Sequence, residues 1–146
     1  MKFPTKVPVA PDGNLENMVA PTIFLTHKYV QLVTFRKSGL PVGTAMWFAL
    51  DESGRMYMQT NAASAKVKRL SNHPEIEVMP SDSRGKPLGP AWRGTTVLHG
   101  PQTAVARKSI ALLKQHYGWI YRIFNFGLWL FRRNLVYLEI QLEAPL

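Results

Sequence analysis

Apolar residues recur in six short segments that are rich in β-branched and aromatic side chains or that alternate with polar ones. Both patterns are typical of β-strands that bury one face. The six segments are Tyr29–Arg36, Val42–Leu50, Arg55–Thr60, Glu75–Met79, Trp92–His99 and Asn134–Leu142. Turn-forming residues at 37–39 and 51–54 separate the first three segments. We therefore expect two consecutive hairpins that form an antiparallel meander.

Three other segments are expected to be helical. Residues 64–70 carry apolar side chains three positions apart with basic residues between them. Residues 103–117 have one apolar side, with Thr103 as a candidate N-cap and Gly118 as the interruption that follows. Residues 14–20 form a short candidate helix that a proline stops.

Strands joined by hairpins rather than by βαβ crossovers predict a mainly β fold of the α+β class. The expected architecture is a closed or nearly closed antiparallel β-barrel with short flanking helices. The 146 residues suffice for one domain, which we place at residues 14–146. Residues 1–13 contain three prolines and no apolar signal core, so we expect a flexible arm on a cytoplasmic protein.

The charge of the chain points to an anionic partner. There are 18 Lys and Arg against nine Asp and Glu, a net charge of +9. Nucleic acid, an acidic membrane surface or a phosphorylated cofactor would each fit that charge. We expect no nucleic-acid partner, because the aromatic residues lie in apolar runs and do not alternate with Lys and Arg. The absence of cysteine excludes disulfides, thiol catalysis and cysteine-bound metal.

Residues 117–131 form an aromatic, apolar segment in which Arg122 is the one charged residue. A helix here would be apolar on two sides, so something must cover it. The segment is too short to span a bilayer, which takes about 20 apolar residues. Packing on the barrel or in a dimer interface is the favoured interpretation. A lid over a substrate pocket and contact with a membrane surface are the alternatives.

The candidate site is the junction between the strand at 55–60 and the helix at 64–70. A helix start presents unpaired backbone N–H groups and the positive end of the helix dipole. Ser64 adds a hydroxyl there, and Lys66 and Lys68 add charges, so the junction suits a terminal phosphate. In the alternative interpretation, Ser64 only caps the helix and the lysines are solvated.

Three motifs in residues 28–100 carry a resemblance to a known family. They are the run TFRKSGLPVGTAMWFA, the T-x-x-x-S-x-K pattern from Thr60 to Lys66, and the R-L-x-x-x-P pattern from Arg69 to Pro74. In order and spacing they resemble the pyridoxamine 5′-phosphate oxidase-like superfamily of FMN-binding split β-barrels, and more narrowly its F420-dependent branch. The resemblance implies an antiparallel split β-barrel that works as a homodimer, with cofactor sites at the subunit boundary. It implies FMN as cofactor, with coenzyme F420 as the alternative.

The resemblance also implies which residues contact the cofactor. They are Thr44, Ala45, Met46, Trp47, Gln59, Thr60, Ser64, Lys66 and Lys68. The backbone of residues 44–47 would run along the flavin or deazaflavin ring. Gln59 and Thr60 would contact the ribityl chain and phosphate, and Ser64 and Lys66 would hold the phosphate.

This chain departs from the oxidase at three positions. Ala65 stands where the oxidase has an arginine, and Thr44 and Ala49 stand where it has basic residues. Fewer basic groups are therefore expected to contact the phosphate than in the oxidase, and Lys68 is the charge that could compensate. These differences argue against oxidation of pyridoxamine phosphate itself.

The expected activity is that of an oxidoreductase that transfers a hydride to or from a small organic substrate. In such a site the reactive atom belongs to the cofactor, and the protein supplies binding and orientation. We accordingly name no catalytic side chain and no metal site, since the four histidines lack metal-ligand spacing. A groove formed by Arg84, Lys86 and Arg93 could hold the acidic tail of F420. The alternative function is a split barrel without redox turnover, either cofactor-free or binding heme or another ligand.

Overall fold

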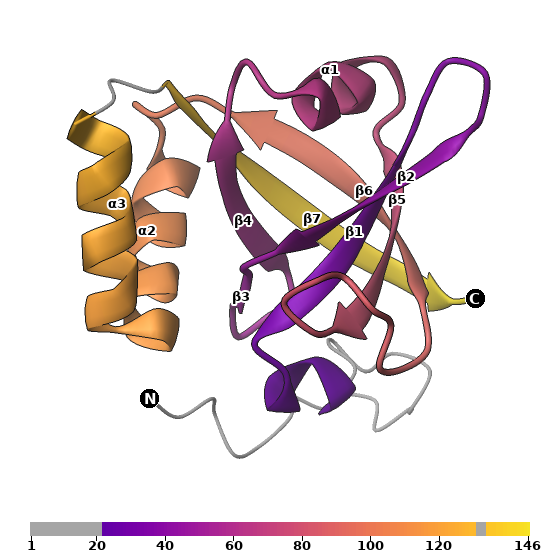
Figure 1. The fold of residues 1–146 in the computed structure, drawn as a ribbon, viewed down its shortest axis with the longest axis horizontal. Coiled ribbons are helices and arrows are strands. Elements are labelled where there is room, and N and C mark those ends of the chain that lie inside the picture. The colour runs from indigo at the N-terminus through magenta and orange to yellow at the C-terminus, as the bar shows by residue number, and fades with distance from the viewer. Residues whose placement is uncertain (1–21, 131–133) are drawn as a thin grey trace.

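The computed structural model describes residues 22–130 and 134–146, which form one antiparallel sheet with helices on one side and at both ends (Figure 1). The strands are β1 (Tyr29–Phe35), β2 (Pro41–Met46), β3 (Ala49–Leu50), β4 (Met56–Asn61), β5 (Glu75–Ser81), β6 (Trp92–His99) and β7 (Leu135–Pro145). The helices are the 3-10 helix η2 (Thr22–Thr26), α1 (Ala65–Asn72), α2 (Ala104–Tyr117) and α3 (Trp119–Leu130). The predicted arm at 1–13 and helix at 14–20 lie outside the described residues.

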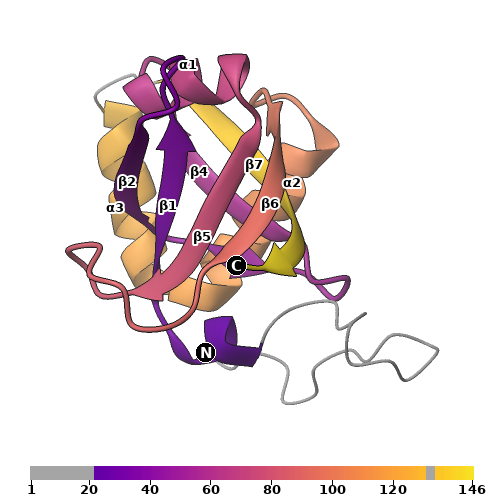
Figure 2. The ribbon, with the colours of Figure 1, turned by 90° about the vertical axis from the view of Figure 1, so that its right-hand side faces the viewer.

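The sheet is curled into a half-barrel. Its strand order is β2-β1-β5-β6-β7-β4-β3, so β2 and β3 form opposite edges. Only Trp47 and Phe48 join these two edges along the chain. A link of two residues spans roughly 10 Å at most, so the sheet has to curl until its edges approach each other. The predicted antiparallel split barrel is therefore confirmed; Figure 2 shows α1 across one end of it.

The two predicted hairpins are confirmed, but they do not join into one continuous meander. The hairpins β1–β2 and β3–β4 do form, with Leu32 opposite Thr44 and Leu50 opposite Met56. However, β2 does not pair with β4; β1 pairs with β5 on its other side, and β4 pairs with β7. Barrel closure separates the two hairpins within the hydrogen-bonded order, although they follow each other in sequence.

The expected strand at residues 42–50 is broken into β2 and β3. At the break, the hydroxyl of Tyr117 accepts a hydrogen bond from the Phe48 backbone N–H at 2.9 Å and donates to the Lys28 carbonyl at 2.7 Å. The indole of Trp47 stacks on the Tyr117 ring, with centroids 4.5 Å apart and planes inclined by 14°. Tyr117 thus takes the place of the sheet partners that the chain gives up where it leaves β2.

The side chains that point into the curled sheet form the core. They include Val30, Leu32, Met46, Phe48, Met56, Met58, Ile76, Val78, Leu138 and Ile140. The alternation predicted for the last strand places Leu138 and Ile140 in this core, as expected for a strand with one inward face. On the outer face of β4 and β7, Tyr57 and Tyr137 are also buried.

The limits of α2 follow the predicted signals. The Thr103 hydroxyl accepts a hydrogen bond from the Ala106 N–H at 3.1 Å, and Gly118 ends the helix with a φ of 63°, which favours glycine. α3 starts immediately afterwards and lies beside α2 (Figure 1). Within the described residues, no helix has both the length and the apolar character needed to cross a membrane.

Replacing Tyr117 by Phe should destabilise the protein by removing the hydroxyl that bridges Phe48 and Lys28. A buried N–H that loses its acceptor costs about 1–3 kcal/mol, so we expect the free energy of unfolding in urea to fall by that amount. Tyr29→Phe is the control, because Tyr29 is also half-buried but bridges no strand break. Equal stability of the wild type and Y117F would contradict this role.

The stability should also depend on pH through His116. Burial, together with the nearby charge of Lys28, lowers the pKa of His116 from 6.5 to about 4. Between these two pH values the unfolded chain binds a proton that the folded chain does not, so the free energy of unfolding should fall as the pH is lowered. We expect a loss of about 1–2 kcal/mol in urea melts between pH 7 and pH 4.5, less than the full shift because His116 is partly solvated. His116→Gln should remove this part of the pH dependence, and an unchanged slope would contradict it.

Candidate functional site

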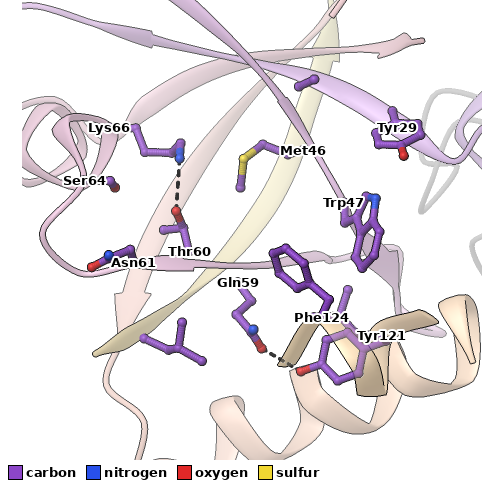
Figure 3. Close-up of a pocket in the computed structure, with 13 residues that line it drawn as sticks. Tyr29, Met46, Trp47, Gln59, Thr60, Asn61, Ser64, Lys66, Tyr121 and Phe124 are labelled. Atoms are coloured by element: carbon purple, nitrogen blue, oxygen red, sulfur yellow. Dashed lines mark hydrogen bonds between the residues drawn. The ribbon is translucent and has the colours of Figure 1, made fainter. Parts of the chain in front are cut away.

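A cavity of about 540 Å³ lies between β2, β4, the start of α1 and the inner side of α3 (Figure 3). Seven of the predicted cofactor-binding residues line it: Ala45, Met46, Trp47, Gln59, Thr60, Ser64 and Lys66. They come from the two strand ends and the helix start that the sequence singled out. The fold therefore brings these residues into one cavity; their role toward a cofactor remains a prediction.

Two predicted residues lie outside the lining. Thr44 is one position before the lining part of β2, opposite Leu32. Lys68 is exposed on α1. Side chains two positions apart on a helix point in nearly opposite directions, so Lys68 faces away when Lys66 faces the cavity.

One end of the cavity is polar. The hydroxyl oxygen of Ser64 is buried and has no hydrogen-bond partner. Ser64 occupies the N-cap position of α1, yet its side chain caps no backbone N–H of the helix. The capping alternative is therefore wrong for this hydroxyl, which is left available at the cavity.

Lys66 lies beside Ser64. Its ammonium donates a hydrogen bond to the Thr60 hydroxyl at 3.0 Å. Burial, and then the charge of Arg69, lower the pKa of Lys66. A desolvated lysine beside an unused hydroxyl and the start of a helix is a site at which an anion would be stabilised. Lys66 is thus half-buried at the cavity, whereas Lys68 is exposed.

None of the described residues that line the cavity carries a carboxylate. The positive charge of Lys66 is therefore not neutralised from within the lining. Among residues 22–130 and 134–146, no group of three or more His, Asp and Glu could hold a metal ion.

The other end of the cavity is aromatic. Trp47 stacks on Tyr117, and the Phe124 ring packs against Trp47 with the two ring centroids 5.1 Å apart. Leu113 completes the apolar wall, whereas Leu135, opposite Asn61 on β4, lies toward the polar end. An end of this kind suits a flat, apolar ring, and the polar end suits a phosphate.

A hydrogen-bonded chain at the cavity wall ties α3 to β4. The Tyr121 hydroxyl donates to Gln59 Oε1 at 2.6 Å, and Gln59 Nε2 donates to Asn125 Oδ1 at 3.2 Å. Burial, and then the neighbouring Tyr137, raise the pKa of Tyr121, which keeps the hydroxyl protonated as a donor. The orientation of the Gln59 amide is therefore fixed by two residues of α3.

Sequence reasoning missed six lining residues: Tyr29, Asn61, Leu113, Tyr121, Phe124 and Leu135. Tyr121 and Phe124 belong to the aromatic segment for which packing, a lid and a membrane contact were the alternatives. The structure gives α3 an inner side that packs and lines the cavity. The remaining four gave no signal beyond those of ordinary strand or helix residues.

The pyridoxamine 5′-phosphate oxidase family matches residues 20–143 of the chain. No curated protein sequence matches it. Among solved structures, the heme storage protein HutZ from Vibrio cholerae is similar at a TM-score of 0.62 and 16% identity, over 82% of this chain and 87% of that one.

Two further structures share the fold. General Stress Protein 26 from Bacillus anthracis has a TM-score of 0.53 and 20% identity, over 83% of this chain and 84% of its own. A pyridoxamine 5′-phosphate oxidase-related, FMN-binding protein from Nostoc punctiforme has a TM-score of 0.51 and 19% identity, over 79% and 70% of the two chains. The family match spans most of the sequence and the sheet has the matching split-barrel form. On this evidence, the chain belongs to the pyridoxamine 5′-phosphate oxidase family.

Proposed function

We propose that the cavity binds FMN and that the protein is a flavin-dependent oxidoreductase acting on a small organic substrate. The observation that supports this most directly is the buried, unpartnered hydroxyl of Ser64 beside the desolvated ammonium of Lys66. A buried polar group without a partner costs about 1–3 kcal/mol, and a phosphate oxygen would satisfy it. The FMN-binding relative from Nostoc punctiforme has the same fold, which adds to the case.

The lining residues divide the work of binding. Ser64 and Lys66 would hold the phosphate, with Thr60 orienting Lys66 through its hydroxyl. The backbone of residues 44–47 would run along the ring, and Gln59 would contact the chain between ring and phosphate. Lys68, exposed on α1, would add only a long-range attraction.

When bound, FMN supplies the electron-accepting ring system for hydride transfer. The protein's own contribution is position and environment. Trp47 and Phe124 would exclude water from the ring, and the positive polar end would hold the anion against the start of α1. We assign no proton-transfer step to any side chain of the lining; the residues described there include no Asp, Glu or His.

Coenzyme F420 is the alternative cofactor for the same cavity. The groove expected for its acidic tail is not part of this cavity, since Arg84, Lys86 and Arg93 are exposed and line none of it. Arg84 and Lys86 lie in a turn whose backbone is held by Asp82. For this reason we favour FMN.

Heme binding without redox turnover is the second candidate, because HutZ is a heme storage protein of the same fold. Heme iron is most often held by a histidine, and none of the described lining residues is one. Added hemin that gives a coordinated Soret spectrum, in protein that takes up no flavin, would favour this candidate.

Removing the side chains that we propose to bind the phosphate should weaken the binding of FMN. We expect Lys66→Ala and Ser64→Ala each to raise the Kd for FMN about ten- to hundredfold, the loss of one charge-assisted hydrogen bond. Quenching of flavin fluorescence on titration measures this. Lys37→Ala, in an exposed turn, is the charge-matched control and should change the Kd less than about threefold. Riboflavin, which lacks the phosphate, should bind both variants and wild type alike. Equal FMN affinity in all variants would contradict the proposed phosphate site. Stronger binding of F420 than of FMN would show that F420, and not FMN, is the preferred cofactor.

We further propose a homodimer with the cavity at the subunit boundary. In support, β2 is an edge strand, and its last residues, Ala45 and Met46, line the cavity. Light scattering at micromolar concentration should give twice the mass of one chain. A monomer that binds FMN with full affinity would contradict a shared site.

A further inference from the structure

α3 exposes a continuous apolar face to solvent. Tyr121 and Asn125, four residues apart, face the sheet and bind Gln59. On the opposite side, Trp119 and Ile123 are 69% and 63% exposed. Ile120, which flanks them on the helix surface, is 46% exposed. Figure 1 shows α3 as the outermost element on this side of the molecule. Large apolar side chains gathered on one outward face mark a contact surface.

The two helices on this side of the molecule, α2 and α3, carry basic residues and no acidic ones. Helices α2 and α3 together carry four Lys and Arg, at positions 107, 108, 114 and 122, and no Asp or Glu; of these, Lys108 is paired with Asp51. On the helices themselves, Arg107, Lys114 and Arg122 are exposed. No acidic side chain on α2 or α3 offsets them.

This charge argues against a second copy of the chain as the occupant of the face. Two copies meeting through the same helix would bring the cations on α2 and α3 toward those of the partner, with no carboxylate on these helices to pair with them. An anionic lipid surface offers what both features require: an apolar layer for the exposed side chains and negative headgroups for the cations.

We propose that the outward face of α3 docks on an anionic membrane surface. A helix of 12 residues is roughly 18 Å long, too short to span a bilayer but long enough to lie along its headgroup boundary. Trp119 favours that boundary because its ring is apolar and carries one polar N–H. The proposal is independent of the cofactor, since the side chains that would enter the lipid face away from the Gln59 side of the helix.

The test is co-sedimentation of the full chain with lipid vesicles of two compositions. One is phosphatidylcholine alone and the other equal parts of phosphatidylcholine and phosphatidylglycerol. We expect at least about tenfold tighter binding to the anionic vesicles, because each cation near the surface contributes about a factor of five. Added salt should weaken this binding, by screening the charges.

Two variants separate the apolar and the charged contributions. Ile123→Ser should weaken binding to anionic vesicles on the order of tenfold, the loss of one inserted aliphatic side chain. Arg122→Gln should weaken it about fivefold while leaving any binding to neutral vesicles unchanged. Leu40→Ser is the matched control: Leu40 is 51% exposed in the turn between β1 and β2, and its replacement should change nothing. Urea melts of each variant establish that it is folded.

Three results would overturn the proposal: no binding of the wild type to anionic vesicles, equal binding of I123S and wild type, or equal loss in L40S. If I123S breaks a dimer while the wild type ignores vesicles, the face is instead an interface between copies. FMN binding, measured separately on I123S, should stay at the wild-type level, so failure of this proposal and failure of the flavin site give different results.

Discussion

Closure of the sheet across a two-residue link is the constraint on which the other features depend. β2 and β3 lie at opposite edges of the hydrogen-bonded order, and Trp47 and Phe48 alone join them. The link gives Phe48 to the core and Trp47 to the cavity, so the same two residues close the barrel and begin the site. Tyr117 stabilises this arrangement, because its hydroxyl accepts a hydrogen bond from the Phe48 N–H and donates one to the Lys28 carbonyl.

The polar end of the cavity holds two groups that have given up contact with water. Lys66 has lost part of its hydration, and the Ser64 hydroxyl has lost water without gaining a partner. Such groups are preorganised in the sense that part of their desolvation has already taken place before a ligand arrives. The side chain at the N-cap of α1 makes no hydrogen bond to the helix and instead lines the cavity.

Local signals in the sequence predicted most elements and little of their arrangement. The strand Trp92–His99 was found with the same limits, and Thr103 caps its helix as expected. The break at Trp47 was not predictable, because Met46, Trp47 and Phe48 give no turn signal and the break depends on Tyr117, 69 positions from Phe48. The pairing of β4 with β7 is equally non-local. At the site, Ser64 and Lys66 could be singled out by type and spacing, whereas Tyr121 and Phe124 resemble packing residues until the helix is placed.

The hydrogen bonds of the Gln59 amide connect the cavity wall to α3. Both of its hydrogen-bond partners belong to α3, and their donor and acceptor roles admit one orientation of the amide. A shift of α3 by one residue along its axis would part Gln59 from Tyr121 and Asn125 together and free the amide to rotate. The orientation of the Gln59 amide at the cavity wall and the position of α3 at the surface of the molecule are thus coupled through two hydrogen bonds. A force that displaces α3 would therefore also act on the cavity wall.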